Sequence, residues 1–362
     1  MALLYLDVTK SRKQRHHSGL RRLRMGLQRG LQEVPGLTVR ECRWSYVRCG
    51  YVEVAGGRKI TGPGTLFLTP EVFALRERPL SGAWLARYRG ASATIYYDAI
   101  PFTHPEVTWP KSVRRFEPWF RGLPRYDKVF YISSSAMQEA CELAKQRGVR
   151  LPQGAVIPLG ADYQARPVSR ESLRGRGGKP LLLSTGIVEP RKGYPELLQA
   201  AEALWAGGAD FKLVILGRVN PWYGKPIAME INRLRQRGRD LVHEWEADDD
   251  RLAHWHARAS LVVQPSHAEG FGLPVLEALW SGCPVLCSRQ PCVERVPEEK
   301  GLSVLPEVTV EALRGALGRL LQNPSLIDEL EAAVPSNAIP VWREGAETLY
   351  RAFGEGHRAS SS

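Results

Sequence analysis

The sequence predicts an α/β protein with two domains, and three observations support this prediction. Apolar runs of strand length alternate along the chain with helical stretches and loops, which is the pattern of a doubly wound α/β domain. The chain has 362 residues, 43% of them hydrophobic and 24% charged, which suits two hydrophobic cores. A polar segment rich in Arg and Gly, residues 163–179, lies near the middle, and we predict that it links the domains.

The first half opens with an apolar run at residues 2–8 that predicts a strand, and residues 18–32 predict a helix. The basic loop between them ends at Gly19. Runs of apolar residues predict four more strands, and a strand with a turn closes this half; they cover residues 37–44, 65–68, 93–98, 129–134 and 155–163.

The second half opens with a strand, a loop and an amphipathic helix over residues 181–204. Asp248–Asp250 form the acidic first turn of a further helix. A C-terminal helix is predicted over residues 335–353, followed by a low-complexity tail that we expect to be disordered. The remaining strands are predicted at 211–217, 241–247, 261–263 and 285–288.

Charge is distributed unevenly along the chain. Residues 1–165 hold 26 Lys and Arg against 13 Asp and Glu, whereas residues 166–362 are nearly neutral, within a total of +12. The segment Lys10–Arg29 alone has eight basic residues and no carboxylate. This excess favours an anionic partner for the first domain, either a membrane surface or an anionic glycan, and the alternative is a basic face that only contacts solvent.

The compartment follows from two features. No apolar run approaches the roughly 18 residues of a membrane span, and no signal peptide is visible. The six cysteines show neither a C-x-x-C pair nor metal-ligand spacing, which predicts reduced thiols. We therefore expect a cytoplasmic protein that contacts the inner membrane face, if it contacts a membrane, only peripherally.

Residues 264–288 carry the clearest chemical pattern. A β-branched run ending at Val263 predicts a buried strand, and Gly272 leads into a helix with Pro274 in its first turn. This places residues 269–272 at a strand's carboxyl end and a helix N-terminus, where open sheets bind ligands and phosphates. Glu269 and Glu277 flank this point, although such glutamates by themselves are more often helix caps.

The segment EGFGLPVLE, with seven residues between its glutamates and followed by ALWSGCPV, resembles the E-x7-E signature of family 4 glycosyltransferases. The resemblance implies the GT-B architecture: two Rossmann-like domains facing across a cleft, with a C-terminal helix that crosses back onto the first. It also implies that Glu269 and the backbone after it bind sugar hydroxyls and diphosphate, and that Glu277 accepts hydrogen bonds from the ribose. The donor-binding backbone would be that of Gly270, Phe271, Gly272 and Leu273.

GIVEPRKG, residues 186–193, is the second motif; alone, it is more often an exposed charged turn. Family members carry an Arg and a Lys in this loop that clamp the donor diphosphate. Gly186 opens the loop and Lys192 matches directly, whereas Ile187 stands at the common Arg position. The resemblance to members that read E-P-R-K implies that Arg191 supplies the second charge from a shifted backbone position.

Two segments of the first half also resemble the family. Ser18 and Gly19 match a glycine loop that faces the diphosphate and the acceptor, although without G-x-G-x-x-G a plain turn fits equally well. Residues 94–106 resemble a strand and loop near the donor sugar, in which Asp98 matches and implies a catalytic role. Tyr97 stands where a histidine is usual, and His104 would face the acceptor.

Ser133–Ser135 resemble a strand end at which a serine caps the next helix, and we predict a structural N-cap there.

The implied reaction moves a hexosyl group, with retention, from a nucleotide-diphosphate sugar to a glycan or lipid-linked glycan acceptor, as in bacterial surface polysaccharide synthesis. It needs no cofactor and no metal, and no D-x-D stands at a strand end to hold one. The E-P-R-K and D-x-x-P resemblances favour GDP-mannose. The predicted parts are an acceptor-side domain, 1–165, a nucleotide-sugar domain, 166–335, and a crossover helix with a tail, 336–362.

Two other classes remain as alternatives. A basic nucleic-acid-binding protein would show aromatic residues interleaved with a basic stripe, and this pattern is absent. A Rossmann-type oxidoreductase would carry G-x-G-x-x-G after its first strand, where this chain has TKSRKQRHHSG. We therefore expect no nucleic-acid partner.

Overall fold

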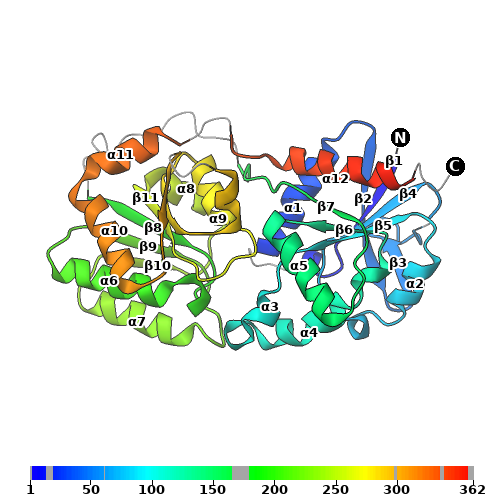
Figure 1. Cartoon of the computed structure of the whole chain (residues 1–362), viewed down its shortest axis with the longest axis horizontal. Helices are drawn as coiled ribbons and strands as arrows, with labels where there is room; N and C mark the ends of the chain where they lie inside the picture. The colour runs from blue at the N-terminus through cyan, green and yellow to red at the C-terminus, as the bar shows by residue number, and fades with distance from the viewer. Residues whose placement is uncertain are drawn as a thin grey trace. The chain divides into compact units, whose positions relative to one another are not determined.

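The computed structural model describes residues 2–13, 19–60, 62–164, 179–296, 300–334 and 338–357. The chain divides into two compact units: unit 1 is Met1–Gly160 with Pro340–Ser362, and unit 2 is Ala161–Ile339. Each unit has its own largely parallel sheet with helices on its faces, as the α/β prediction requires (Figure 1). Most of the predicted linker, residues 163–179, lies outside the described residues.

The sheet of unit 1 has the strand order β3-β2-β1-β4-β5-β6-β7. All neighbours are parallel except β2 and β3, which form an antiparallel hairpin at the edge that the sequence did not predict. The predicted strand at 93–98 begins and ends two residues earlier, so that Asp98 lies in the loop after it. The strands are β1 Ala2–Asp7, β2 Leu37–Ser45, β3 Gly50–Glu53, β4 Thr65–Thr69, β5 Ala91–Tyr96, β6 Lys128–Tyr131 and β7 Gly154–Val156.

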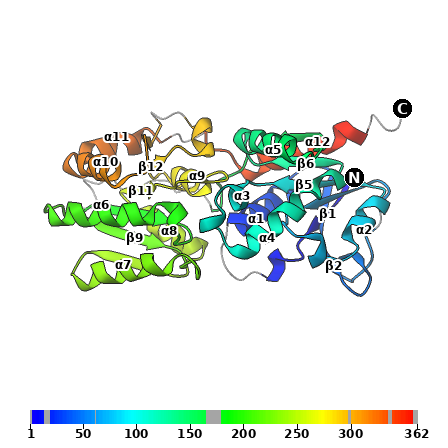
Figure 2. The same cartoon turned by 60° about the horizontal axis from the view of Figure 1, so that its bottom comes forward.

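The C-terminal helix α12, Trp342–His357, belongs to unit 1 and packs against α1, Gly19–Gln32 (Figures 1 and 2). The contact needs glycine, because a Cβ on Gly26 would come within 2.1 Å of the Trp342 ring. The predicted return of this helix to the first domain is confirmed. Its predicted bounds were wrong: residues 338–341 are not helical, and residues 354–357, expected to be disordered, continue the helix. Residues 335–337 and the end of the tail lie outside the described residues.

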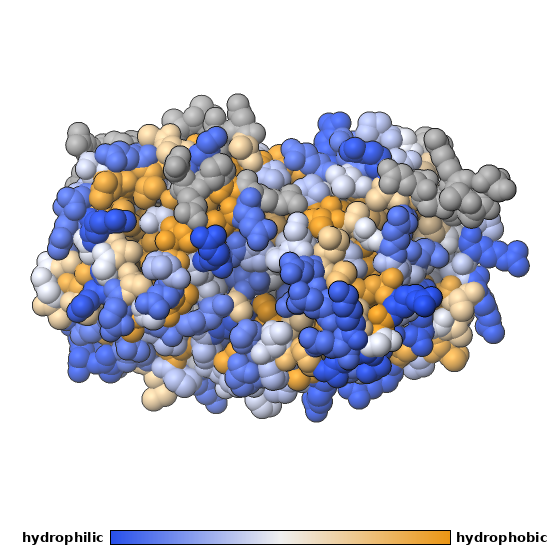
Figure 3. All heavy atoms as spheres, viewed as in Figure 1, coloured by the Kyte–Doolittle hydropathy of each residue, from blue (hydrophilic) through white to orange (hydrophobic). Residues whose placement is uncertain are grey.

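The other helices of unit 1 connect consecutive parallel strands. Ser133 caps α5 as predicted, since its Oγ accepts the Ala136 N–H at 3.0 Å. These helices are α2 Ser81–Arg87, α3 Ile100–Thr103, α4 Pro110–Phe120 and α5 Ser134–Arg147. On the face drawn in Figure 3, hydrophilic residues gather over α4 and α5.

Unit 2 has six strands, all parallel, in the order β10-β9-β8-β11-β12-β13. The strands are short, and the inner ones, β8, β9, β11 and β12, are buried on both faces, as in other sheets covered by helices on both sides. They are β8 Leu181–Thr185, β9 Lys212–Leu216, β10 Leu241–Glu244, β11 Leu261–Gln264, β12 Val285–Ser288 and β13 Leu302–Leu305.

Four helices of unit 2, α6, α7, α10 and α11, bury apolar side chains in one continuous core with this sheet. The acidic turn predicted at Asp248–Asp250 is confirmed, because Asp248 caps α8 and accepts the Arg251 N–H at 2.8 Å. The helices are α6 Tyr194–Ala206, α7 Lys225–Gln236, α8 Asp249–Arg258, α9 Leu273–Trp280, α10 Val310–Gln322 and α11 Pro324–Ala332.

The strand order determines where a ligand can bind in unit 2. From β8 the chain proceeds outward through β9 to β10, and then returns to place β11 on the other side of β8. The neighbours β8 and β11 therefore form a topological switch point, and their following loops diverge at the carboxyl edge of the sheet. Both motifs predicted to bind the donor, residues 186–193 and 269–273, lie in these two loops.

Candidate functional site

The loop after β11 enters α9 through a glycine that the site requires. Gly272 has φ +100°, and a Cβ there would come 2.4 Å from Gln290 Oε1 and 2.6 Å from Cys292 Sγ. Phe271 is buried, and its carbonyl accepts the Cys292 N–H at 2.8 Å. The turn from Gly270 to Leu273 is therefore supported by Gln290 and Cys292. It places the N-terminus of α9 at the carboxyl edge of the sheet.

The loop after β8 is pressed against the loop after β11. Gly193 has φ +69°, and a Cβ on it would come 2.0 Å from the Pro265 carbonyl oxygen. The His267 N–H donates to the Arg191 carbonyl at 2.8 Å. Gly186, with φ +131°, lies beside the Lys192 side chain. This backbone contact brings the basic residues of one motif to the acidic residue of the other.

Lys192 and Glu269 form an ion pair at this contact, in which Lys192 Nζ donates to Glu269 Oε1. Ser266 Oγ donates to the same oxygen at 2.8 Å. Both charged side chains are 11% exposed. Burial by itself would raise the pKa of Glu269, but the charges of Lys192 and Arg191 and these hydrogen bonds lower it to about 2. Burial lowers the pKa of Lys192, and Glu269 opposes that shift.

Arg191 is held by several groups at once. Its Nε and Nη2 donate to Glu189 Oε1 at 3.2 and 2.8 Å, and its Nη1 donates to the Ala268 carbonyl at 2.5 Å. Nη1 also lies 3.4 Å from Glu269 Oε2. The other carboxylate oxygen of Glu189, Oε2, accepts a hydrogen bond from Asn220 Nδ2 at 2.7 Å. The predicted cations and Glu269 thus form one network, joined by Glu189, Asn220 and Ser266.

Glu277 lies in the middle of α9 and is 5% exposed. A glutamate on an exposed helix face would stay accessible to solvent. The burial of Glu277 is therefore consistent with a side chain that binds a ligand at this helix. Its carbonyl accepts a hydrogen bond from Ser281 Oγ at 2.9 Å, which anchors the end of α9.

The candidates in unit 1 are placed less closely together. Gly19 is the exposed first residue of α1, and Ser18 lies outside the described residues. Asp98 Oδ1 accepts the Ile100 N–H at 3.0 Å. His104 is about half exposed and lies 3.6 Å from Glu106. Tyr97 is buried, and its hydroxyl donates to the Pro70 carbonyl at 2.5 Å, so it has a structural role where family members have a histidine.

A buried charged cluster in unit 1 was missed by the sequence reasoning. Arg78, 1% exposed, donates to Asp7 Oδ2 at 2.5 Å and also to Glu71. Glu71 in turn accepts the N–H groups of Lys10 and Ser11 at 2.7 and 2.8 Å. Burial and the nearby Asp7 raise the pKa of Glu71 to about 7. The available signal was a carboxylate at or just after the end of both β1 and β4.

The basic segment Lys10–Arg29 is partly engaged within unit 1. Lys10 pairs with Glu77 at 3.1 Å, and Arg24 lies 3.8 Å from Glu41. Arg21, Arg22 and Arg29 also interact with neighbouring groups. Arg15 lies outside the described residues. Fewer of these cations are therefore available to an outside partner than the sequence alone indicates.

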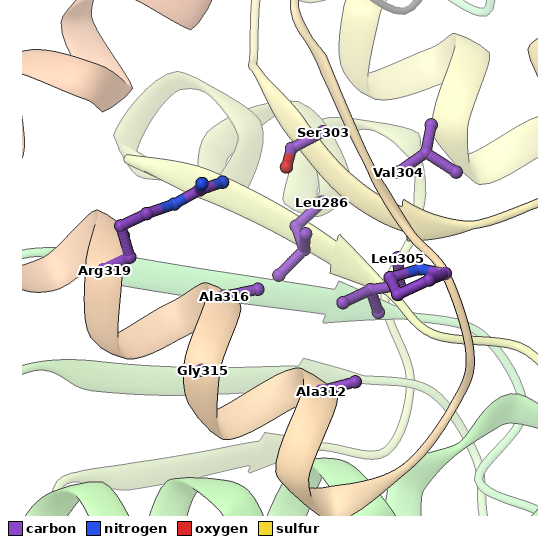
Figure 4. Close-up of a pocket in the computed structure, with 9 residues that line it drawn as sticks. Leu286, Ser303, Val304, Leu305, Ala312, Gly315, Ala316 and Arg319 are labelled. Atoms are coloured by element: carbon purple, nitrogen blue, oxygen red, sulfur yellow. The ribbon is translucent and has the colours of Figure 1, made fainter.

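A pocket of about 280 Å³ lies away from these residues, between α10 and the edge strand β13 (Figure 4). It contains none of the predicted site residues. Its lining is Leu286, Ser303, Val304, Leu305, Pro306, Ala312, Gly315, Ala316 and Arg319.

Within the described part of the chain, no three His, Cys, Asp or Glu side chains are grouped so as to hold a metal ion. In the same part, none of the helices combines the length and apolar character needed to cross a membrane.

Residues 165–338 match the family model described as glycosyl transferases group 1. The chain is 28% identical over 287 residues to the serotype-specific mannosyltransferase WbdA of Escherichia coli. The aligned region covers 73% of this chain but only 34% of WbdA. It is also 28% identical to O-antigen chain mannosyltransferase B of Escherichia coli, with 65% of this chain and 62% of that protein covered. The chain thus spans about a third of the length of WbdA.

Among solved structures, sucrose-phosphate synthase from Thermosynechococcus elongatus superposes with a TM-score of 0.70 at 19% identity, over 99% of this chain and 100% of that one. This similarity shows the fold. Residues 165–338 are therefore similar to the glycosyl transferases group 1, the chain as a whole is similar to mannosyltransferases, and its fold is GT-B.

Proposed function

We propose that the protein is a retaining glycosyltransferase that moves a hexosyl group from a nucleotide-diphosphate sugar to a glycan or lipid-linked glycan acceptor. The observation that supports this most directly is the Lys192–Glu269 pair, placed beside the N-terminus of α9 at the switch point of the unit 2 sheet. Open α/β sheets bind nucleotides at this position.

The departure of a nucleoside diphosphate leaves negative charge that the protein must stabilise. Lys192 and the first N–H groups of α9 supply preorganised positive charge there. In the pair with Glu269, the ammonium group is already oriented toward the loop that would hold the sugar. A diphosphate arriving at this loop would share Lys192 with Glu269, whose other oxygen would accept from sugar hydroxyls.

The reaction requires that the acceptor hydroxyl loses a proton as the new glycosidic bond forms. In the proposed front-face transfer, a leaving diphosphate oxygen accepts that proton, so no side-chain base is needed. Glu277 accepts hydrogen bonds from the ribose hydroxyls and orients the nucleotide. Asp98, in the loop after β5, is the proposed catalytic carboxylate of unit 1. No metal or cofactor takes part in this scheme.

GDP-mannose is the favoured donor in this proposal. The E-P-R-K and D-x-x-P motifs favour it, and two relatives are named as mannosyltransferases, one of them of the O-antigen chain. The same relatives favour a role in bacterial surface polysaccharide synthesis. The basic unit 1 would bring the enzyme to a lipid-linked acceptor at the cytoplasmic face of an anionic membrane, or would hold an anionic glycan.

The test is a donor panel. The protein is incubated with GDP-mannose, UDP-glucose, UDP-N-acetylglucosamine and dTDP-glucose, and the released nucleoside diphosphate and sugar products are identified by mass spectrometry. Slow hydrolysis of one donor, abolished in Lys192→Ala, is the expected result. Absence of binding and turnover with every nucleotide sugar would rule out the function.

A further inference from the structure

The predicted role of Arg191 as a diphosphate clamp does not fit its contacts. A guanidinium that binds a ligand bidentately must present one edge of its fork to that ligand. Here the Nε–Nη2 edge is occupied by Glu189, and Nη1 is directed to Ala268 and Glu269. The Arg191 side chain is 15% exposed and Glu189 is 8% exposed, so both charges are largely removed from water.

We infer that Arg191 is a positioning residue: Glu189 and Asn220 hold its guanidinium, which in turn fixes the loop that carries Glu269. The inference rests on the proposed function and assigns the diphosphate contact to Lys192 instead. Asn220 and Glu189 become positioning residues of the same site, although neither was predicted from the sequence.

Asn220 is itself firmly placed, which makes it a suitable anchor. It follows β9 and is 4% exposed. Its N–H donates to the Val188 carbonyl at 3.0 Å, and its Oδ1 accepts the Trp222 N–H at 2.9 Å. Only its Nδ2 is directed to Glu189. The anchor thus joins the loop after β9 to the loop after β8.

Arg191 then transmits this position to the loop after β11. Its side chain donates to the Ala268 carbonyl, and its own carbonyl accepts the His267 N–H. Two main-chain groups next to Glu269 are therefore bound to one residue. If Arg191 turned toward a diphosphate, the buried carboxylate of Glu189 would lose its cation and Glu269 would lose its support, and both losses are unfavourable.

Lys192 differs from Arg191 in the way expected of a ligand-binding cation. Among the described residues its ammonium group pairs with one carboxylate, Glu269, and Ser266 can continue to satisfy that carboxylate if Lys192 shifts. An ammonium group is also a rotatable point charge, which adapts to a phosphate oxygen without a fixed fork. The two adjacent cations of the motif therefore have different roles: Arg191 positions the loop and Lys192 binds the diphosphate.

The experiment separates nucleotide binding from sugar positioning. Calorimetry measures the affinities for GDP and GDP-mannose, and for UDP and UDP-glucose, and donor hydrolysis gives kcat and KM. We expect Arg191→Gln to keep the affinity for the nucleoside diphosphate within about threefold, while kcat falls at least tenfold. Lys192→Gln should weaken nucleoside diphosphate binding about tenfold or more, as loss of one charge-assisted hydrogen bond does.

Three further variants sharpen the result. Arg191→Lys keeps the charge but not the fork, so it should be as impaired in kcat as Arg191→Gln. Asn220→Ala should lower kcat without weakening diphosphate binding. Glu189→Gln combined with Arg191→Gln should be no worse than either alone, because they act through one path. Arg239→Gln is the matched control, since Arg239 forms the same forked contact with Glu202 before β10 and should leave every kinetic constant unchanged.

Thermal unfolding verifies that each variant folds. If Arg191→Gln does not fold, Asn220→Ala and Arg191→Lys still test the inference. A loss of GDP or UDP affinity in Arg191→Gln as large as in Lys192→Gln, together with rescue by Arg191→Lys, would overturn the inference and restore the clamp. If the wild type binds none of these four nucleotides and none of the other sugars of the donor panel, the proposed function itself fails.

Discussion

Lys192 Nζ donates a hydrogen bond to Glu269 Oε1 across 77 residues of sequence. The two residues come from the two motifs that point independently to a nucleotide sugar, and they meet because β8 and β11 are neighbours in the sheet. The contact gives the site a charged pair that is nearly closed to water. Five predictions follow from this pair and from the structure around it.

Replacing Lys192 by alanine should lower kcat about 10²–10³-fold, because one preorganised charge partner of the leaving group is lost. The measurement is steady-state turnover of the donor identified in the panel. Lys212→Ala, on the amino-terminal residue of β9, is the control and should turn over normally. Normal turnover in Lys192→Ala would contradict the proposed mechanism.

Replacing Glu277 by alanine should weaken nucleoside diphosphate binding roughly ten- to a hundredfold, since hydrogen bonds to a charged group contribute about 1.5–3 kcal/mol. Calorimetry with GDP and UDP measures it, and the melting temperature checks the fold. An unchanged affinity would assign Glu277 to the helix alone.

Replacing Arg78 by methionine should destabilise the protein by about 3–5 kcal/mol, because two buried carboxylates, Asp7 and Glu71, lose their shared cation. Urea unfolding gives the free energy. The control is Arg233→Met, which breaks an exposed pair with Glu230 and should cost about 1 kcal/mol or less. Equal effects of the two substitutions would contradict the importance of the buried cluster.

The pKa of Glu269 is lowered from its usual 4.5 to about 2, so its ion pair stabilises the fold above about pH 4.5. This contribution should be lost as the pH falls from about 4.5 to 2, because the unfolded chain takes up the proton first. Comparing the pH dependence of unfolding of wild type and Glu269→Gln isolates the effect. The two curves should converge toward pH 2; curves that stay parallel would show that the pair does not control this titration.

Gly193→Ala should impair both stability and nucleotide binding, because the residue has φ +69° and its Cβ would meet the Pro265 carbonyl at 2.0 Å. Gly208→Ala is the matched control: it has φ +89° but open space around the Cβ, so it should cost only about 1 kcal/mol for the backbone conformation. GDP binding and thermal unfolding measure the difference. If the control loses as much nucleotide affinity, the contact between the two loops is not what holds the site.

Much of the fold could be predicted because its signals are local. The apolar strand at residues 261–263, the helix that begins after Gly272, the N-cap at Ser133 and the acidic first turn at Asp248–Asp250 were all visible in short windows. The β2–β3 hairpin escaped prediction because its second strand has only two apolar residues, Tyr51 and Val52, between a glycine and a glutamate. The N-terminal bound of α12 was wrong because the local signal of Pro340 was not used: a proline disfavours helix at the residues before it, and α12 begins only at Trp342.

The sequence by itself determined the two-domain α/β class and the family resemblance. It also identified Glu269, Glu277, Lys192 and Arg191 as candidate site residues. It did so because spacing, composition and helix-capping chemistry are properties of neighbouring residues. Only the tertiary structure decided that Arg191 is bound by Glu189, that Asn220 supports Glu189, and that Asp7, Glu71 and Arg78 share one buried cluster. Those contacts depend on strand order and register, which bring together residues far apart in the chain. No local pattern encodes which charge will face which, because the free energy of each buried pair depends on the packing that surrounds it.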